Sequence, residues 1–307
     1  ERQRDGKEQS MRKHRFPEPK SPEKKRAGAK RALRNAAIAL VVLALLTLGG
    51  SVAWGRLTDT SYFDTTFYEL QDDKIQNDVR IVFLSDLHLQ EFGKDNANLI
   101  AAVADLAPDI IAIGGDMNVM GNPDYSKVLT LVAGLVPIAP VYYALGNHEY
   151  NDYLFADSNL LEDVKKLGAT VLSNHYVTIE VDGNVIDIGG LNEMSNHFKE
   201  YSQKFYTKYM ESENYRLLLA HDPAYFDSGA LVGEPIDLAL CGHRHGGQAI
   251  IPFLGGLYHP GNGILPDMTQ GAHDVSGTWV VVSRGLGNTE KIPRINNPPE
   301  LVVIDLY

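Results

Sequence analysis

The stretch that decides the fold of this chain reads PIDLALCGHRH and occupies residues 235–245. Its apolar first part, residues 235–240, has the length of a buried strand, and Gly242 marks the strand end. His243 and His245 lie one residue apart just beyond that end, so both imidazoles cannot face the core. An exposed or hydrogen-bonded histidine pair is one interpretation, and a pair of metal ligands is the other. The choice depends on whether distant segments provide matching partners.

Polar groups of the same kind follow four other apolar strands. In chain order they are Asp86 and His88 after residues 79–84, Asp116 after residues 109–113, Asn147 and His148 after residues 140–145, and His221 after residues 216–220. Alone, the Asp86-x-His88 pair could be a helix cap beside a surface imidazole. Because the carboxyl ends of parallel strands share one edge of a sheet, we expect all these groups to converge there.

The ligand types indicate which ions such a site takes. Carboxylate, amide oxygen and imidazole without thiolate suit divalent Mn, Fe, Zn or Ni. Seven ligating groups, which are those named above without His148, are too many for a single ion. Two ions roughly 3.5–4 Å apart, bridged by a shared carboxylate and a hydroxide, account for them and are used for phosphoester hydrolysis.

The remaining pattern predicts a four-layer α/β/β/α sandwich over residues 79–307. Strands and helices alternate up to Gly168, and short strands then dominate. Asp182-Gly183 predicts a two-residue hairpin turn between the strands 175–181 and 185–188. Further strands are expected at residues 248–251, 278–283 and 301–306, and a helix at residues 197–210.

The segment before this domain has a different composition. Residues 1–34 are rich in Lys, Arg and Pro and are expected to form a disordered cytoplasmic tail. No charged residue occurs in residues 35–55, which predicts one transmembrane helix acting as a signal anchor. The basic flank predicts that the chain after Arg56 lies outside the cytoplasm. A cleaved signal ending near Ala53 is the alternative, and residues 56–78 are expected to contain a juxtamembrane linker and the first strand.

Charge and cysteine content exclude several classes of protein. The net charge of −11 combines +8 in residues 1–34 with −19 in the remainder. An acidic domain does not bind long nucleic acids well, because phosphate backbones are bound by clustered Lys and Arg. Cys241 is the single cysteine of the chain, which excludes an internal disulfide, and its apolar flank predicts a buried thiol.

The ordered motifs Asp-x-His, Gly-Asp, Gly-Asn-His-Glu, His and Gly-His-x-His resemble those of the calcineurin-like metallophosphoesterases. The resemblance extends from about Arg80 to the end of the chain. Residues 242–248 with Pro252, and residues 283–287 followed by 297–300, are similar to a bacterial membrane-associated branch. That branch includes phosphodiesterases that cleave UDP-2,3-diacylglucosamine-type lipids.

The resemblance implies a role for each of these side chains. One ion would be held by Asp86, His88, Asp116 and His245, and the other by Asp116 as a bridge with Asn147, His221 and His243. His148 would face the scissile phosphate, where a positioned imidazole can donate a proton to the leaving oxygen. Met117 and Asn118 depart from the family's usual continuation after Asp116, which affects expectations for substrate contacts and not for the metal ligand.

Other residues have less specific expectations. Arg284 follows a strand end and is a candidate for binding phosphate, whereas Arg244 is expected to be solvated, with phosphate binding as the alternative. The aromatic stripe of residues 197–209 is expected to pack on the sandwich, and the alternative is that it receives an acyl chain. The histidines outside the motifs, expected to be surface or structural residues, are His14, His259 and His273.

The first functional hypothesis is therefore a membrane-anchored dinuclear metal phosphoesterase that hydrolyses phosphodiester or pyrophosphate bonds, with lipid-linked head groups as candidate substrates. A protein or small-molecule phosphomonoesterase on the same site is the second. A non-catalytic metal-binding ectodomain is the third, and a non-ligating imidazole at His148 argues against it. No obligate protein partner is evident from the sequence.

Overall fold

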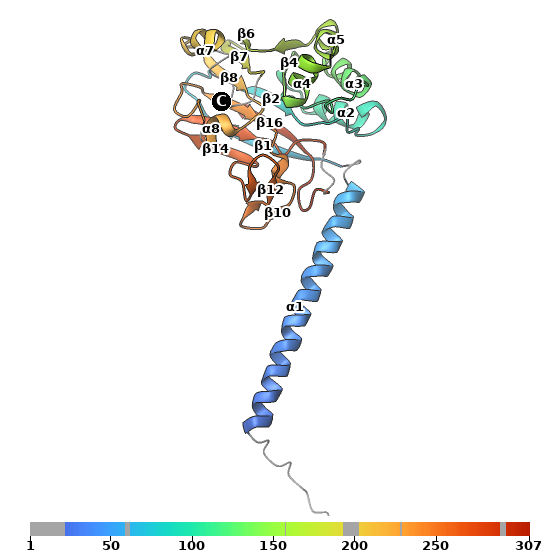
Figure 1. The fold of residues 1–307 in the computed structure, drawn as a ribbon. Coiled ribbons are helices and arrows are strands. Elements are labelled where there is room, and N and C mark those ends of the chain that lie inside the picture. The colour runs from blue at the N-terminus through green and yellow to red at the C-terminus, as the bar shows by residue number, and fades with distance from the viewer. Residues whose placement is uncertain (1–21, 59–61, 157, 193–202, 228, 289–292) are drawn as a thin grey trace, which may run out of the picture. The chain divides into compact units, whose positions relative to one another are not determined.

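The computed structural model describes residues 22–58, 62–156, 158–192, 203–227, 229–288 and 293–307. The chain divides into two compact units, residues 1–50 and residues 51–307. The second unit contains all the strands described below and the predicted metal ligands (Figure 1).

Helix α1 (Pro22–Thr58) includes the residues for which the sequence predicts a membrane span. Among the residues that the structure describes, no helix has both the length and the apolar character needed to cross a membrane. The predicted span over residues 35–55 is therefore not confirmed. Residues 22–34 are helical, whereas the sequence predicts disorder for them. Proline at the first helical position and a run of Ala, Lys and Arg explain this helix start.

The first sheet of the domain has six strands. In spatial order they are β1 (Asp64–Leu70), β16 (Glu300–Leu306), β2 (Val79–Leu84), β3 (Ile110–Ile113), β4 (Val141–Ala144) and β5 (Thr170–Leu172). Only the β16 and β2 pair is antiparallel among these neighbours. The first strand expected within residues 56–78 is β1, which pairs with β16 along its whole length.

The second sheet also has six strands. In spatial order they are β14 (Gly271–Val275), β15 (Thr278–Val282), β9 (Leu238–Cys241), β8 (Tyr215–Leu219), β7 (Asn184–Gly190) and β6 (His175–Val181). The two outermost pairs are antiparallel and the inner pairs are parallel. Val181 pairs with Asn184, so Asp182 and Gly183 form the predicted two-residue turn.

Three apolar clusters hold the domain together in four layers. One cluster lies between the two sheets, and the other two join each sheet to its helices. The helices on the first sheet are α2 (Ala97–Asp105), α3 (Ser126–Leu135) and α5 (Leu160–Lys166), and those on the second are α7 (Gln203–Met210) and α8 (Ala224–Asp227) (Figure 1). The predicted α/β/β/α sandwich is confirmed for this domain.

Strand β2 shows why its sequence is almost continuously apolar. Ile81 and Phe83 belong to the cluster between the sheets, whereas Val82 and Leu84 belong to the cluster under the helices. Successive side chains of a strand point to opposite faces, so a strand covered on both sides needs apolar residues at every position.

Some elements of the domain differ from the sequence-based expectation. Helix α4 (Asn147–Phe155) was not predicted, because its sequence lacks an apolar stripe and only two of its side chains are buried. The strand expected at residues 248–251 is reduced to β10 (Ile250–Ile251), which pairs with β11 (Gly255–Gly256). A second small hairpin joins β12 (Tyr258–His259) and β13 (Gly263–Ile264). Short 3-10 turns occur at η1 (Lys94–Asn96) and η2 (His245–Gly247).

Candidate metal centre

The predicted ligands come together at one edge of the sandwich. Their side chains follow the carboxyl ends of β2, β3 and β4 in the first sheet and of β8 and β9 in the second. Three groups of ligand atoms, each with all atoms within 4.8 Å of one another, occur among the described residues. The groups are Asp86 with His88 and His245, His88 with Asp116 and His148, and Asp116 with His221 and His243.

The first group places two imidazoles against one carboxylate. His245 Nε2 lies 3.4 Å from Asp86 Oδ1, and His88 Nε2 lies 3.9 Å from the same oxygen. The Nε2 atoms of the two histidines are 3.1 Å apart, and their rings are stacked. Three ligand atoms thus surround one small volume, as a divalent ion requires.

Asp116 lies between this group and the next. Its Oδ2 atom is 3.2 Å from His221 Nε2, 4.0 Å from His88 Nε2 and 3.8 Å from His148 Nε2. His221 and His88 belong to different ligand groups, so this carboxylate lies between the two groups.

Hydrogen bonds fix the tautomers of two of these histidines. His221 Nδ1 lies 2.7 Å from the main-chain oxygen of Gly114, and His88 Nδ1 lies 3.2 Å from that of Asn118. A carbonyl only accepts, so each Nδ1 carries a proton. The Nε2 atom of His88 then presents a lone pair to the cavity, and that of His221 does so when a cation replaces its second proton. Asn147 Oδ1 is buried there and has no hydrogen-bond partner among the residues that the structure describes. Lone pairs that converge in this way fit bound cations.

The electrostatics of the site also favour cations. Burial raises the pKa of Asp86 to about 6. Burial acts to lower the pKa of His221, but the Asp116 carboxylate more than offsets it and raises that pKa to about 10. Burial lowers the pKa of His88 to about 3. The carboxylates therefore require positive charge nearby, and His88 stays in the neutral form that binds metal.

The backbone around the ligands is held in sparsely populated conformations. Five of the seven predicted ligands have positive φ angles. They are Asp86, His88, Asp116, His243 and His245. Such non-glycine residues cost free energy and persist where the surrounding structure over-determines them, which is common at functional sites. Glycines allow the loops to approach, because a Cβ on Gly115 would lie 2.0 Å from the Gly146 nitrogen.

Glu149 connects two of the ligand loops, a role that sequence reasoning did not assign. Its carboxylate accepts the main-chain N–H groups of Asp116 at 2.7 Å, Met117 at 2.7 Å and Gly146 at 3.0 Å, and the hydroxyl of Tyr143 at 2.9 Å. Glu149 is the third residue of α4, where a side chain that bonds back to the preceding N–H stabilises the helix start. The signal in the sequence that could have indicated this role is the Glu that ends the Gly-Asn-His-Glu motif.

Asp152, one turn further along α4, holds the loop that follows Asp116. It accepts Asn118 Nδ2 at 2.7 Å and the N–H of Gly121 at 2.8 Å. That loop presents the Met120 N–H to His148 Nδ1 at 2.9 Å. Since a main-chain N–H only donates, His148 Nδ1 accepts, and the neutral ring carries its proton on Nε2, which faces Asp116.

A cavity of about 210 Å³ opens over these groups. Its lining residues are His88, Asp116, Asn147, His148, His243, His245, Gln248, His259, Pro260 and Gly261. The side chain of His148 is 15% exposed, compared with 2% for Asp116 and 1% for His88. His148 is thus more accessible to a molecule in the cavity than these two ligands are.

His259 is a residue whose place the sequence did not indicate. It is buried and lines the cavity, and its Nε2 donates to the main-chain oxygen of His243 at 3.1 Å. The expectation of a structural histidine holds, but its location beside the metal ligands was missed because His259 lies outside every motif. His273 contacts the main-chain oxygen of Gln270, and His14 lies outside the described residues.

The two arginine expectations are not borne out by the geometry. Arg244 is fully buried and pairs with Asp227 at 3.1 Å, so the prediction of a solvated side chain is wrong. Arg284 pairs with Glu300 at 3.1 Å and with Asp64 at 3.4 Å, and it does not line the metal cavity. Its guanidinium joins β1 and β16 to the loop after β15, and so Arg284 lies outside the site.

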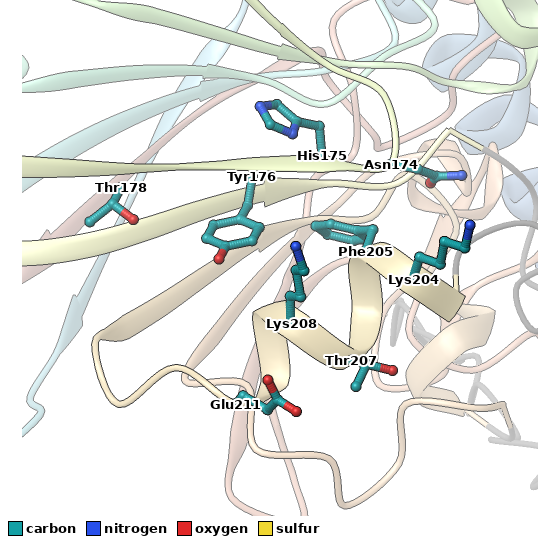
Figure 2. A pocket seen from close by; sticks show the side chains of 9 residues that line it. All are labelled: Asn174, His175, Tyr176, Thr178, Lys204, Phe205, Thr207, Lys208 and Glu211. Carbon is teal, nitrogen blue, oxygen red and sulfur yellow. The ribbon is translucent and has the colours of Figure 1, made fainter.

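A larger groove, of about 980 Å³, lies between β6 and α7 (Figure 2). Phe205 and Lys208 project from α7 toward Tyr176 of β6. The ring centroids of Phe205 and Tyr209 are 5.5 Å apart, and Tyr209 is fully buried. This confirms packing on the sandwich for the described part of the aromatic stripe. Residues 197–202 of that stripe lie outside the described residues.

Cys241 ends β9 and has no exposed surface, and burial raises the pKa of its thiol. The predicted buried thiol is confirmed. Cys241 therefore contributes packing beneath the ligand loop and not a metal ligand.

The geometry described above defines a class of protein: an α/β sandwich of two sheets with a centre of nitrogen and oxygen ligands at one edge. The family profile described as calcineurin-like phosphoesterase matches residues 79–247. The chain belongs to the calcineurin-like metallophosphoesterase family. It is accordingly a metal-dependent phosphoester hydrolase.

Several relatives share most of the chain. The protein named uncharacterized metallophosphoesterase YkuE of Bacillus subtilis (strain 168) is 30% identical over 235 residues, covering 74% of this chain and 78% of its own. Phosphodiesterase YaeI of Escherichia coli (strain K12) is 28% identical over 234 residues, covering 74% of this chain and 82% of its own. Among solved structures, a 5'-nucleotidase precursor from Thermus thermophilus is 15% identical with a TM-score of 0.47, covering 69% of this chain and 50% of its own.

Proposed function

We propose that this chain is a membrane-anchored phosphodiesterase with two divalent ions in its centre. Its substrates would be molecules with lipid-linked head groups, in which it would hydrolyse a phosphodiester or pyrophosphate bond. The observation that carries the proposal is the convergence of the ligand groups around Asp116, with the unpartnered oxygen of Asn147 among them. A site of buried lone pairs without cations would be costly, because buried polar groups need partners.

The assignment of ligands follows the geometry of the two outer groups. Asp86, His88 and His245 would hold one ion, His221, His243 and Asn147 would hold the other, and Asp116 would bridge them. Mn, Fe, Zn or Ni suits this set of donors. Such ions supply Lewis-acid stabilisation of a phosphoryl oxygen and lower the pKa of bound water.

His148 would act on the substrate without binding metal. The Met120 N–H holds its Nδ1 as an acceptor, so the Nε2–H points toward the cavity and can donate to a phosphoryl or leaving oxygen. The main-chain N–H of His148 donates to Asp116 Oδ1 at 2.8 Å, which fixes the distance between this imidazole and the bridging carboxylate.

Sequence composition supports the proposed membrane anchor, and a relative's name supports phosphodiester hydrolysis. Residues 35–55 contain no charged residue and follow a strongly basic segment. The N-terminus would then be cytoplasmic and the catalytic domain extracytoplasmic. The relative YaeI is named a phosphodiesterase. Fractionation of cells that express the full chain tests the anchor, which fails if alkaline carbonate releases the protein from membranes.

Substitution of His148 by Asn tests the catalytic assignment. We expect His148→Asn to retain the metal content of the unsubstituted chain and to lose about 10²–10⁴-fold in turnover, the usual contribution of a positioned general acid. The matched control is His273→Asn, which removes an imidazole away from the centre. If His148→Asn hydrolyses substrate at the original rate, the assigned role is wrong.

A substrate panel separates the proposed phosphodiesterase from a phosphomonoesterase. The full chain, loaded with manganese, is assayed on a phosphomonoester, a soluble aryl phosphodiester and a nucleotide-diphospho-lipid. Higher kcat/KM on the two diester or pyrophosphate substrates supports the proposal. Preference for the phosphomonoester would replace it with the alternative function on the same site.

A further inference from the structure

Two short hairpins beside the metal cavity expose an unusual amount of apolar surface. They are β10–β11 and β12–β13, within residues 249–266. Phe253 is fully exposed, Ile264 is 76% exposed and Leu254 is 65% exposed. The other large apolar side chains exposed on these hairpins are Leu257, Tyr258 and Leu265. Single exposed apolar residues are ordinary, but six within thirteen positions indicate an interaction surface.

The two hairpins form one structure that borders the site. Leu257 N donates to the main-chain oxygen of Ala249, and Leu265 N donates to that of Leu257, both at 2.8 Å. The turn of the second hairpin contributes His259, Pro260 and Gly261 to the lining of the metal cavity. Whatever covers the apolar side chains is therefore held next to the metal ligands.

The charge distribution indicates which kind of partner fits this surface. Residues 249–266 contain no Asp, Glu, Lys or Arg, and the next charged residue is Asp267. Residues 35–307 as a whole carry a net charge of −19. An uncharged segment in an acidic domain fits a partner surface that is apolar and provides no counter-charges. The tip residue Phe253 has a φ of +69° and projects fully into solvent. A projecting tip enters a lipid layer readily, whereas a protein partner would need a pocket to receive it.

We propose that the hairpin tips of residues 249–266 dock on a lipid surface and insert Phe253, Leu254 and Ile264 at the boundary of head groups and acyl chains. This places the metal cavity against the head groups, so that a lipid-linked phosphodiester reaches His148 without leaving the membrane. The inference deepens the proposed function and rests on it for the identity of the substrate. The docking itself is a separate physical property.

A fluorescent label at position 253 tests the docking directly. The full chain carrying Phe253→Cys is labelled with an environment-sensitive nitrobenzoxadiazole thiol reagent and reconstituted in phosphatidylcholine vesicles. Cys241 is fully buried and does not compete for the label. The matched control is Val232→Cys, because Val232 is also exposed (45%) and lies between α8 and β9. We expect a blue-shifted emission, quenched by brominated phosphatidylcholine, for the label at position 253 and not for the label at position 232.

Two outcomes would overturn the docking proposal. One is equal quenching, or none, at the two labelled positions. The other is shielding of the label at position 253 by an added protein fraction but not by lipid, which would identify the surface as a protein interface. Both readouts are independent of hydrolysis, so they do not depend on the success of the proposed function.

A kinetic comparison then connects the surface to the substrate. We expect Phe253→Ser/Leu254→Ser to lower kcat/KM on a vesicle-borne phosphodiester by about tenfold, equivalent to about 1.4 kcal/mol. The same variant should hydrolyse a soluble aryl phosphodiester normally. Val185→Ser/Val232→Ser, which removes two exposed apolar side chains elsewhere, serves as the control. Equal effects on both substrates would refute the role in substrate access. If the label inserts and no lipid substrate is cleaved, docking stands and the proposed substrate is wrong.

Discussion

Replacing Glu149 by Gln changes almost no volume and removes the charge that joins two ligand loops. In the native site, Oε2 accepts the N–H groups of Asp116 and Gly146, while Oε1 accepts the Met117 N–H and the Tyr143 hydroxyl. A glutamine offers one acceptor oxygen and one NH₂ group, which only donates. If the NH₂ group replaces Oε2, the N–H groups of Asp116 and Gly146 both face another donor. If it replaces Oε1, the Met117 N–H does so, while the Tyr143 hydroxyl can rotate and accept from the NH₂ group.

The size of the effect follows from the bonds that are lost. A hydrogen bond to a charged group contributes about 1.5–3 kcal/mol, and a buried donor left unsatisfied costs about 1–3 kcal/mol. The amide takes the orientation that leaves the Met117 N–H without an acceptor, so we expect the free energy of unfolding to fall by about 1.5–3 kcal/mol, a substantial part of the 5–15 kcal/mol typical of native proteins. The loop that carries Asp116 should also shift, because Glu149 contacts its main chain directly.

Urea unfolding and metal analysis measure these two consequences in the same preparation. Tyr143→Phe is the matched control, because it removes one neutral donor to Glu149 and should cost only about 1 kcal/mol. We expect Glu149→Gln to bind less metal per chain and Tyr143→Phe to bind nearly the native amount. An unchanged urea midpoint together with full metal content in Glu149→Gln would show that this carboxylate does not position the ligand loops.

Three further predictions concern the close approach of loops, the metals and the single thiol. In Gly242→Ala the new Cβ would lie 2.1 Å from Ser85 Oγ and 2.2 Å from Asp86 Oδ2. Thermal unfolding should therefore show a free energy of unfolding lower by about 1–3 kcal/mol. Gly261→Ala, whose Cβ would lie 3.5 Å from its nearest neighbour, should unfold normally, and equal melting of the two variants would contradict the argument. Removal of metal by a chelator should lower the melting temperature, and manganese at about 100 times its Kd should restore about 2.7 kcal/mol; a melting temperature that does not respond to metal would refute cation binding by the folded state. Cys241 should be unreactive toward a disulfide reagent in the native chain and react once in urea, and rapid native labelling would show that β9 opens.

Much of the sandwich could be read from the sequence because its central strands are covered on both faces. β2, β3, β8 and β9 are apolar runs interrupted only by Arg80 and Arg216, and their bounds were predicted within three residues. Where the chain is half exposed, that information is lost. β14 mixes polar and apolar residues at the edge of its sheet, and α4 begins inside the ligand loop without an apolar stripe.

The ligand set could also be proposed from the sequence, because each group follows a strand that belongs to the same edge. The supporting interactions could not. Arg244 lies between two predicted ligands, yet its guanidinium is buried with Asp227, and Arg284 pairs with Glu300 and Asp64 away from the cavity. A sequence does not specify which carboxylate a cation meets when the two are separated by many residues.

By itself, the amino-acid sequence determined where the buried strands lie along the chain, the type of donor that follows each ligand-bearing strand and the exclusion of thiolate ligands. These depend on local periodicity and composition, which need no knowledge of distant neighbours. Only the tertiary structure decided that Asp116 lies between two groups of imidazoles, that a main-chain N–H sets the tautomer of His148, and that the hairpins of residues 249–266 expose their apolar side chains beside the cavity. The reason is physical: distances between side chains far apart in the chain arise from the packing of whole sheets and loops, and neither periodicity nor composition contains those distances.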